Sequence, residues 1–228
     1  MSSPIKTVDL SFQYPGAKEE IIKEINLEVN QGEVLAVVGL SGSGKTTLCY
    51  CLSGIIPHVY DGKLTGQVFL GGRPTVEMDI SEIATQVGIV FQNPETQIFF
   101  PQVEDELAFG PENLCLDREE IGERIEQVLS LLDLEGKRKV RTEHLSGGQK
   151  QLVALASVLT LEPEILIFDE VMAHIDTKGK QLIKEIIREL KAEGKTIIMV
   201  EHNLDNIDLA DRKLVLQQGR LNKFVGEL

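Results

Sequence analysis

An uninterrupted apolar run, Val34 to Val38, leads directly into the glycine-rich segment Gly39-Leu-Ser-Gly-Ser-Gly-Lys-Thr46. Such a run is typical of a strand that is buried on both faces of a parallel sheet. The segment matches G-x-x-x-x-G-K-[ST], in which the glycines let backbone N–H groups turn inward around phosphates. A helix after the loop adds the positive end of its dipole. Because an apolar strand precedes the segment and a helical stretch follows it, a phosphate-binding loop is favoured over a plain glycine turn.

Two residues at the end of this loop carry the expected phosphate chemistry. Lys45 is expected to reach the β- and γ-phosphates of a nucleotide, and the Thr46 hydroxyl is expected to ligate Mg²⁺. The rest of the phosphate cradle is expected to come from Gly39, Ser41, Gly42, Gly44 and Thr47.

A second apolar strand, Ile165 to Phe168, ends in two adjacent carboxylates, Asp169 and Glu170. Alone, such a pair is weak evidence, since acidic residues often cap a strand. Behind a phosphate-binding loop it matches the Walker B pattern. Asp169 is then expected to hold the hydration shell of Mg²⁺, and Glu170 is expected to polarise the water that attacks the terminal phosphate.

Strands and helices alternate along most of the chain. Further buried strands are expected at Gly88 to Phe91 and at Thr196 to Val200. Alternating apolar residues from Val8 to Tyr14 and from Ile25 to Val29 indicate half-buried strands. A long polar and helical stretch lies between Asn93 and about Thr160. This order predicts an α/β fold with a mostly parallel sheet.

The most specific segment is Leu145-Ser-Gly-Gly-Gln149. Ser146 and Gln149 have the spacing of a capping box at the head of an amphipathic helix, and two glycines there allow an anion to approach the backbone closely. The segment resembles the ABC ATPase family, whose signature motif is LSGGQ. The resemblance implies a head-to-tail pair of subunits with two ATPs between them. In such a pair the γ-phosphate held by one P-loop contacts the other subunit's signature: Ser146, Gly147, Gly148 and Gln149.

The same resemblance implies roles for four further residues. Tyr14 stands where the family has an aromatic ring that stacks on adenine, although a strand-end tyrosine is the alternative. Gln92 matches the Q-loop glutamine, which senses Mg²⁺ and the transport partner and takes part in catalysis. Asp176 matches the D-loop aspartate at the dimer interface, and His202 matches the switch histidine that contacts the γ-phosphate. His174 departs from the family pattern, which has a small residue there; a solvated histidine is preferred over a pH-sensitive contact.

The resemblance covers nearly the whole chain and implies a single ABC ATPase domain of the P-loop NTPase class. Its mostly parallel sheet core carries an N-terminal antiparallel β part and an inserted helical subdomain. Residues 1–91 and 161–228 are expected to form the nucleotide-binding core. Residues 92–160 are expected to form the helical subdomain with the signature motif.

The segments Phe91 to Phe99 and Val103 to Gly110 are similar to the ATPases of energy-coupling-factor importers, as are Pro57-His58 and Gly62 to Gly66. These importers take up vitamins or transition-metal ions. The similarity implies that two ATPases dock through residues 93–110 onto a membrane-embedded coupling subunit. A separate small membrane protein then binds the substrate, whose identity is not written in this chain.

Many energy-coupling ATPases continue into a C-terminal extension, whereas this chain stops at Leu228, shortly after Gly219-Arg220. Three explanations stay open: a naturally short member, one half of a fused double ATPase, or a truncated chain. The second ATPase of the pair is either a copy of this chain or a different subunit.

Charge and hydropathy limit the partners and the cellular location that we expect for the protein. The chain has 23 Lys+Arg against 36 Asp+Glu and a net charge of −13, which disfavours unspecific attraction to nucleic acid and anionic lipid. No stretch approaches the roughly 20 apolar residues that span a bilayer. We therefore expect a peripheral protein on the cytoplasmic face of the cell membrane. The spacing of Cys49, Cys51 and Cys115 indicates reduced thiols.

Three other classes of protein are less compatible with the sequence. The main alternative is a soluble ABC ATPase that acts on nucleic acid or ribosomes, but the halves of the chain are joined without heptads and one cassette is present. A GTPase is disfavoured because an NKxD motif is absent. A scaffold that binds nucleotide without hydrolysis is disfavoured by Glu170 and His202.

Overall fold

The computed structural model describes residues 3–173 and 175–225. Contacts between residues divide the chain into two compact units. The sheet unit comprises Met1–Ile89, Glu164–Glu170 and Leu190–Leu228. The helical unit comprises Val90–Pro163 and Val171–Glu189. Residues 171–189, which the sequence analysis assigned to the core, thus cluster with the helical unit.

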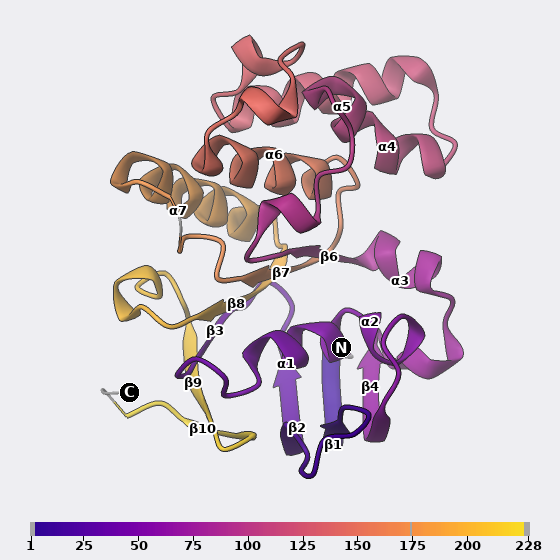
Figure 1. Cartoon of the computed structure of the whole chain (residues 1–228), viewed down its shortest axis with the longest axis vertical. Helices are drawn as coiled ribbons and strands as arrows, with labels where there is room; N and C mark the ends of the chain where they lie inside the picture. The colour runs from indigo at the N-terminus through magenta and orange to yellow at the C-terminus, as the bar shows by residue number, and fades with distance from the viewer. Residues whose placement is uncertain (1–2, 174, 226–228) are drawn as a thin grey trace. The chain divides into compact units, whose positions relative to one another are not determined.

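The sheet unit contains an antiparallel sheet with the strand order β2-β1-β4-β5. Figure 1 shows β1, β2 and β4 side by side. The expected alternation is present, since Ile22, Ile25, Leu27 and Val29 are buried in β2 between more exposed neighbours. The bounds are β1 (Ile5–Gln13), β2 (Ile22–Val29), β4 (Lys63–Leu70) and β5 (Arg73–Pro74).

A second sheet in this unit has the strand order β10-β9-β3-β8-β7-β6. The pairs β9–β3, β3–β8 and β8–β7 are parallel, and β9–β10 is antiparallel. This arrangement confirms the mostly parallel sheet expected from the sequence. Every residue of β3, β7 and β8 is buried, which explains their uninterrupted apolar runs. The bounds are β3 (Val34–Val38), β6 (Val87–Val90), β7 (Ile165–Asp169), β8 (Thr196–Glu201), β9 (Arg212–Gln217) and β10 (Arg220–Lys223).

The helices of the sheet unit are short and lie between its strands along the chain. The first, α1, begins at Lys45 as expected and buries Leu48, Cys49 and Leu52 in the core. The short helix α3 and the C-terminal strand β10 are not predicted by the patterns in the sequence. The bounds are α1 (Lys45–Leu52), α2 (Ile55–His58), α3 (Ile80–Gln86), η1 (Thr75–Glu77) and η5 (Leu204–Asn206).

The helical unit is built from amphipathic helices (Figure 1). In α5 the residues Ile121, Ile125, Val128 and Leu129 are buried at helical spacing. In α6 most side chains after the first turn are buried, so this helix is the centre of the unit's core. The bounds are α4 (Val103–Asn113), α5 (Arg118–Leu131), α6 (Gly147–Leu159), α7 (Thr177–Ala192), η2 (Pro94–Thr96), η3 (Glu135–Lys137) and η4 (Thr142–His144).

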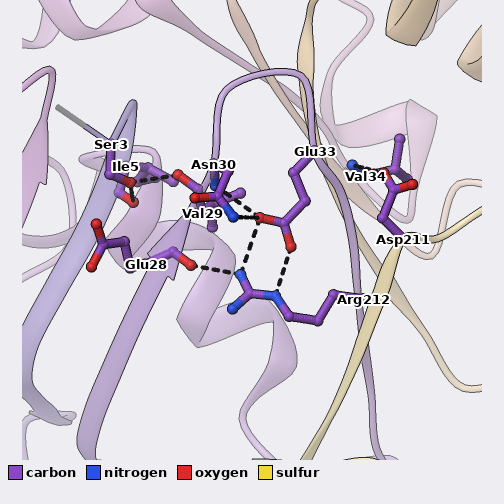
Figure 2. Close-up of polar contacts among 9 residues, drawn as sticks. All are labelled: Ser3, Ile5, Glu28, Val29, Asn30, Glu33, Val34, Asp211 and Arg212. Carbon is purple, nitrogen blue, oxygen red and sulfur yellow. Dashed lines mark hydrogen bonds and ion pairs between the residues drawn. The ribbon is translucent and has the colours of Figure 1, made fainter. Parts of the chain in front are cut away.

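A polar clamp joins the two sheets of the sheet unit, between the end of β2 and the start of β9 (Figure 2). The buried Glu33 carboxylate accepts from Arg212 Nε at 2.6 Å and from Arg212 Nη2 at 3.2 Å. Its Oε2 also accepts from the backbone N–H and the side-chain amide of Asn30, at 2.8 and 3.0 Å. Arg212 donates further to the carbonyl oxygen of Glu28. The clamp satisfies a carboxylate that would otherwise be costly to bury.

Candidate functional site

The glycine-rich loop lies between β3 and α1 in the sheet unit. Two of its glycines are required by geometry. Gly44 has φ 101°, and a Cβ on Gly39 would lie 2.6 Å from the carbonyl oxygen of Leu216. Among the residues that the structure describes, no side chain caps the N-terminus of α1. The N–H groups of its first turn are therefore left for a ligand, in the geometry that suits an anion.

Ser43 in the same loop has a buried hydroxyl without a hydrogen-bond partner among the described residues. Buried hydroxyls are nearly always hydrogen-bonded, so this one calls for an explanation. A phosphate oxygen in the loop would satisfy it. The donors of the loop thus fit the nucleotide that the sequence pattern predicts.

Lys45 is only 5% exposed, and its ammonium is fixed by three oxygens. Its Nζ donates to the carbonyl oxygens of Gly39 at 2.9 Å and Leu40 at 3.1 Å. It also forms an ion pair with Glu170 Oε1 at 3.2 Å. These contacts hold the Lys45 ammonium at the opening of the loop, beside the carboxylate of Glu170, the residue that follows β7.

Glu170 links the loop to the segment after β8. Its second oxygen, Oε2, lies 2.9 Å from Nδ1 of His202. An ionised carboxylate can only accept, so the proton of this hydrogen bond is on Nδ1. The backbone N–H of Glu170 donates to the carbonyl oxygen of Val200 at 2.9 Å, and its φ of 52° is left-handed. A glutamate held in that region carries backbone strain of the kind that clusters at functional sites.

Asp169 is buried at the end of β7, with 2% of its surface exposed. Burial raises its pKa above the usual value, while a hydrogen bond from the Thr46 side chain opposes the rise. The charge of Glu170 raises the pKa further, and that of Lys45 lowers it. Asp169 and Thr46 therefore present two oxygens beside the phosphate loop, the kind of ligand that a hard divalent cation prefers.

Tyr14 follows β1 and is held against α1. Its hydroxyl lies 3.2 Å from Thr47 Oγ1, and its ring packs edge-on against Phe12 with centroids 4.8 Å apart. The structure therefore brings Tyr14 to the helix that follows the phosphate loop. Its expected stacking on adenine stays a prediction.

In the helical unit, the expected capping box at the start of α6 is confirmed. Ser146 Oγ accepts from the backbone N–H of Gln149 at 3.3 Å, and Gln149 Oε1 accepts from the backbone N–H of Ser146 at 3.1 Å. A Cβ on Gly147 or Gly148 would meet no atom of the described residues within 4 Å, apart from its own neighbours in the helix. The packing of the chain therefore does not require these glycines, and their bare backbone is open to an approaching group.

A cavity of about 400 Å³ opens beside this capped turn, wholly within the helical unit. Asp176 lies on its wall and caps α7, since its Oδ1 accepts from the backbone N–H of Gly179 at 2.8 Å. The structure thus brings Asp176 to the Leu145–Gln149 turn. The cavity is lined by Ser146, Gly148, Gln149, Leu152, Leu132, Asp133, Leu134, Lys137, Ile175, Asp176, Lys178, Gly179 and Leu182.

The comparison with known families decides what this set of motifs belongs to. A family model described as "ABC transporter" matches residues 22–173. This chain belongs to the ABC transporter ATP-binding family. As an ABC transporter ATPase subunit it binds and hydrolyses ATP.

Relatives match the ABC ATPase over nearly all of its length. A Pyrococcus horikoshii protein named as an ABC transporter ATP-binding protein is 43% identical over 219 residues, 95% of this chain and 77% of the relative. One from Methanosarcina mazei is 42% identical over 222 residues, 96% of this chain but 38% of the relative. This chain therefore spans most of some relatives and little more than a third of others.

Solved structures give the same family. CbiO1 from Clostridium perfringens, described as part of the ABC transporter complex CbiONQ, is 32% identical with a TM-score of 0.82. The match covers 97% of this chain and 88% of that one. A dimeric bacterial ABC transporter cassette gives a TM-score of 0.84 at 25% identity, over 97% and 99% of the two chains.

The ABC motifs fall into two groups, one in each unit. The sheet unit brings together Lys45, Thr46, Asp169, Glu170 and His202, whereas the helical unit holds the signature turn, Asp176 and the exposed Gln92. His174 lies outside the described residues. Three residues near the motifs were not singled out from the sequence. Ser43 could have been, because it lies inside the P-loop pattern. Lys137 and Lys178 could not, because only the fold brings them to the cavity beside the signature turn.

Within the two described stretches, 3–173 and 175–225, no helix is long and apolar enough to cross a membrane. All three cysteines are free, with Cys49 and Cys51 buried and Cys115 exposed. Burial raises the pKa of the Cys51 thiol to about 12, which keeps it in the unreactive protonated form.

Proposed function

We propose that this ABC ATPase is the motor subunit of an energy-coupling-factor importer, which takes up a vitamin or a transition-metal ion through membrane partner subunits. The observation that carries the proposal is the similarity to CbiO1 over 97% of this chain. It is supported by the segments Phe91 to Phe99 and Val103 to Gly110, which resemble the same importers. The protein is then peripheral, on the cytoplasmic face of the membrane.

In the proposed reaction, the P-loop and Lys45 bind the β- and γ-phosphates of ATP. Thr46 and Asp169 would hold Mg²⁺ beside the phosphates, where the ion would neutralise the developing negative charge. The family resemblance gives Gln92 a separate role as the residue that senses Mg²⁺. Glu170 orients a water in line with the γ-phosphate. Because the phosphoryl-transfer transition state is loose, catalysis by these residues consists of positioning and electrostatics.

His202 acts through its two ring nitrogens. Nδ1 donates to Glu170 at 2.9 Å, which fixes the orientation of both side chains. The other nitrogen, Nε2, is left to contact the γ-phosphate.

Each ATP is proposed to lie between two ABC ATPase subunits. Ser146, Gly147, Gly148 and Gln149 of the second subunit contact the γ-phosphate through the capped turn at the start of α6. The open space over Gly147 and Gly148 supports this assignment, since the described residues of the helical unit leave room there for an approaching group. Asp176 on the same cavity wall is proposed to communicate across the pair.

The membrane partner is proposed to dock on residues 93–110 of the helical unit. Two aromatic side chains there are exposed, Phe99 at 75% and Phe109 at 44%. Exposed large apolar side chains of this kind are typical of interaction surfaces. Phe109 also packs against Phe100, with ring centroids 5.2 Å apart.

The structure sharpens the mutational test of this surface. Glu104, an obvious target for charge reversal, binds Arg138 at 2.6 Å and is part of the unit's own scaffold. Asp105 is exposed and leaves the scaffold intact. Phe99→Asp combined with Asp105→Lys should therefore lower recovery of the membrane subunit in co-purification about tenfold or more, as expected for central interface residues.

The control is Glu143→Lys, which changes an exposed side chain of the helical unit outside residues 93–110. It should leave recovery of the membrane subunit unchanged. Full recovery with the Phe99 and Asp105 changes would reject this docking surface. A soluble ABC ATPase acting on nucleic acid or ribosomes is the alternative function, and the charge of −13 disfavours it.

A further inference from the structure

The two residues that follow the signature motif both reach back to the Q-loop, within the helical unit. Lys150 Nζ forms an ion pair with Glu95 Oε1 at 2.6 Å. The next residue, Gln151, donates from its side-chain amide to the carbonyl oxygen of Phe91 at 3.0 Å. Phe91 directly precedes Gln92, so the two contacts lie on either side of the Q-loop glutamine.

The two contacts differ in exposure. Gln151 is 3% exposed, so its hydrogen bond to Phe91 is shielded from water. The ion pair is open to solvent, because the Glu95 side chain is 67% exposed and that of Lys150 is 21% exposed. An exposed ion pair contributes little to folding stability. We therefore expect the Lys150–Glu95 ion pair to affect the position of the Q-loop more than the free energy of unfolding.

The Q-loop segment is itself braced, so it moves as one piece. The backbone N–H of Phe91 donates to Gln97 Oε1 at 3.1 Å, which closes the segment at its ends. Asn93 Oδ1 accepts from the backbone N–H of Glu95 at 3.0 Å, and the Thr96 hydroxyl donates to the carbonyl oxygen of Asn93 at 2.7 Å. A displacement of one end is therefore passed to the other.

The start of α6 is equally well defined. The capping box between Ser146 and Gln149 fixes the first turn, and Lys150 and Gln151 continue the same helix without a break. A displacement of Lys150 or Gln151 should therefore displace the signature turn, which lies about one helical turn earlier in the same helix.

We propose that Lys150 and Gln151 are positioning residues that lock the signature motif to the Q-loop, so that the two move together. Neither residue is assigned a contact with ATP. Docking of a membrane partner near Gln92 then shifts the signature turn, and closure of the signature on ATP shifts the Q-loop. Only the identity of the docking partner rests on the proposed function.

The test is a double-mutant cycle on the ion pair, read out by steady-state ATP hydrolysis of the full chain. Glu95→Gln and Lys150→Gln should each lower kcat roughly 3- to 10-fold, the range expected when a coupling residue is lost. KM for ATP should stay within about twofold, because the P-loop residues that bind ATP are untouched. The exchanged pair, Glu95→Lys with Lys150→Glu, should restore kcat to within about twofold of the parent.

The chain offers a matched control in the Lys195–Glu164 ion pair. Its atoms are 2.9 Å apart, and its side chains are 17% and 70% exposed, close to those of the tested pair. Glu164→Gln should leave kcat unchanged. A further variant, Gln151→Leu, keeps the bulk of a buried side chain and removes its donor, so it should lower kcat at least as far as Glu95→Gln; thermal unfolding checks that it is folded.

Two results would overturn the proposal: a kcat for Glu95→Gln equal to that of Glu164→Gln, or an exchanged pair no more active than the single variants. The assay needs no membrane partner. A negative result in this assay would therefore not affect the importer assignment. Conversely, if the importer assignment were rejected, a restored kcat in the exchanged pair would still support the coupling between the signature motif and the Q-loop.

Discussion

The ammonium of Lys45 lies 3.2 Å from one carboxylate oxygen of Glu170. The other oxygen of Glu170 receives the Nδ1 proton of His202. One carboxylate thus touches both the cation of the P-loop and the histidine after β8. The residue proposed to orient the attacking water is therefore positioned by both of these neighbours, and its removal should affect turnover and nucleotide affinity differently.

Glu170→Gln should lower ATP turnover by about 100-fold or more, the loss typical of a missing general base. ATP should bind at least as tightly, because the neutral amide no longer repels the γ-phosphate at the mouth of the loop. Phosphate release and nucleotide binding measure the two effects, and size-exclusion chromatography with ATP should show a trapped dimer. Turnover at the parental rate would mean that the base is another residue.

His202→Ala should lower kcat about 10- to 100-fold with a smaller change in KM, since the proposed contact strengthens in the transition state. His144→Ala is a suitable control, because His144 is exposed and lies in η4 of the helical unit. Steady-state hydrolysis of both variants makes the comparison. Equal activities would remove His202 from the mechanism.

Asp169→Asn should stabilise the protein without nucleotide while abolishing hydrolysis. Burial raises the pKa of Asp169, so the folded chain binds its proton more strongly than the unfolded chain does. Above the ordinary pKa of an aspartate, ionised Asp169 therefore costs stability, and the neutral amide removes that cost. The expected gain at neutral pH is on the order of 1 kcal/mol. Chemical denaturation without nucleotide measures it, and a clear loss of stability would show that the Thr46 hydrogen bond outweighs burial.

Arg212→Met should destabilise the fold by about 2–4 kcal/mol, because Glu33 keeps a buried charge without its cation. Figure 2 shows the three hydrogen bonds that would be lost, two to Glu33 and one to the carbonyl oxygen of Glu28. The double variant Arg212→Met with Glu33→Gln should cost less than the sum of the single changes, since no unpaired charge remains. Urea denaturation of the three variants provides the cycle, and additive losses would contradict a specific clamp.

Patterns that are local in the sequence predicted much of this protein. The strand from Val34 to Val38, the start of α1 at Lys45 and the capping box at Ser146 each depend on a few neighbouring residues, and all three are present. The P-loop and signature motifs were sufficient to identify the family. The roles of the individual site residues stay predictions for the experiments above.

What the sequence analysis missed depends on contacts between distant residues or on short elements. Glu33 and Arg212 lie 179 residues apart, and nothing near either one reveals the other. The tie between Glu95 and Lys150 likewise exists only because η2 packs beside α6. The helix α3, with seven residues, is too short for a clear apolar periodicity.

The central claim, a motor for an energy-coupling-factor importer, is tested most directly by affinity purification of the tagged protein from solubilised native membranes, followed by identification of what co-purifies. The account predicts a second ABC ATPase, one membrane-embedded coupling subunit and one small substrate-binding membrane protein. Recovery of only soluble or ribosomal partners would contradict the importer role, although the chain would still be an ABC ATPase.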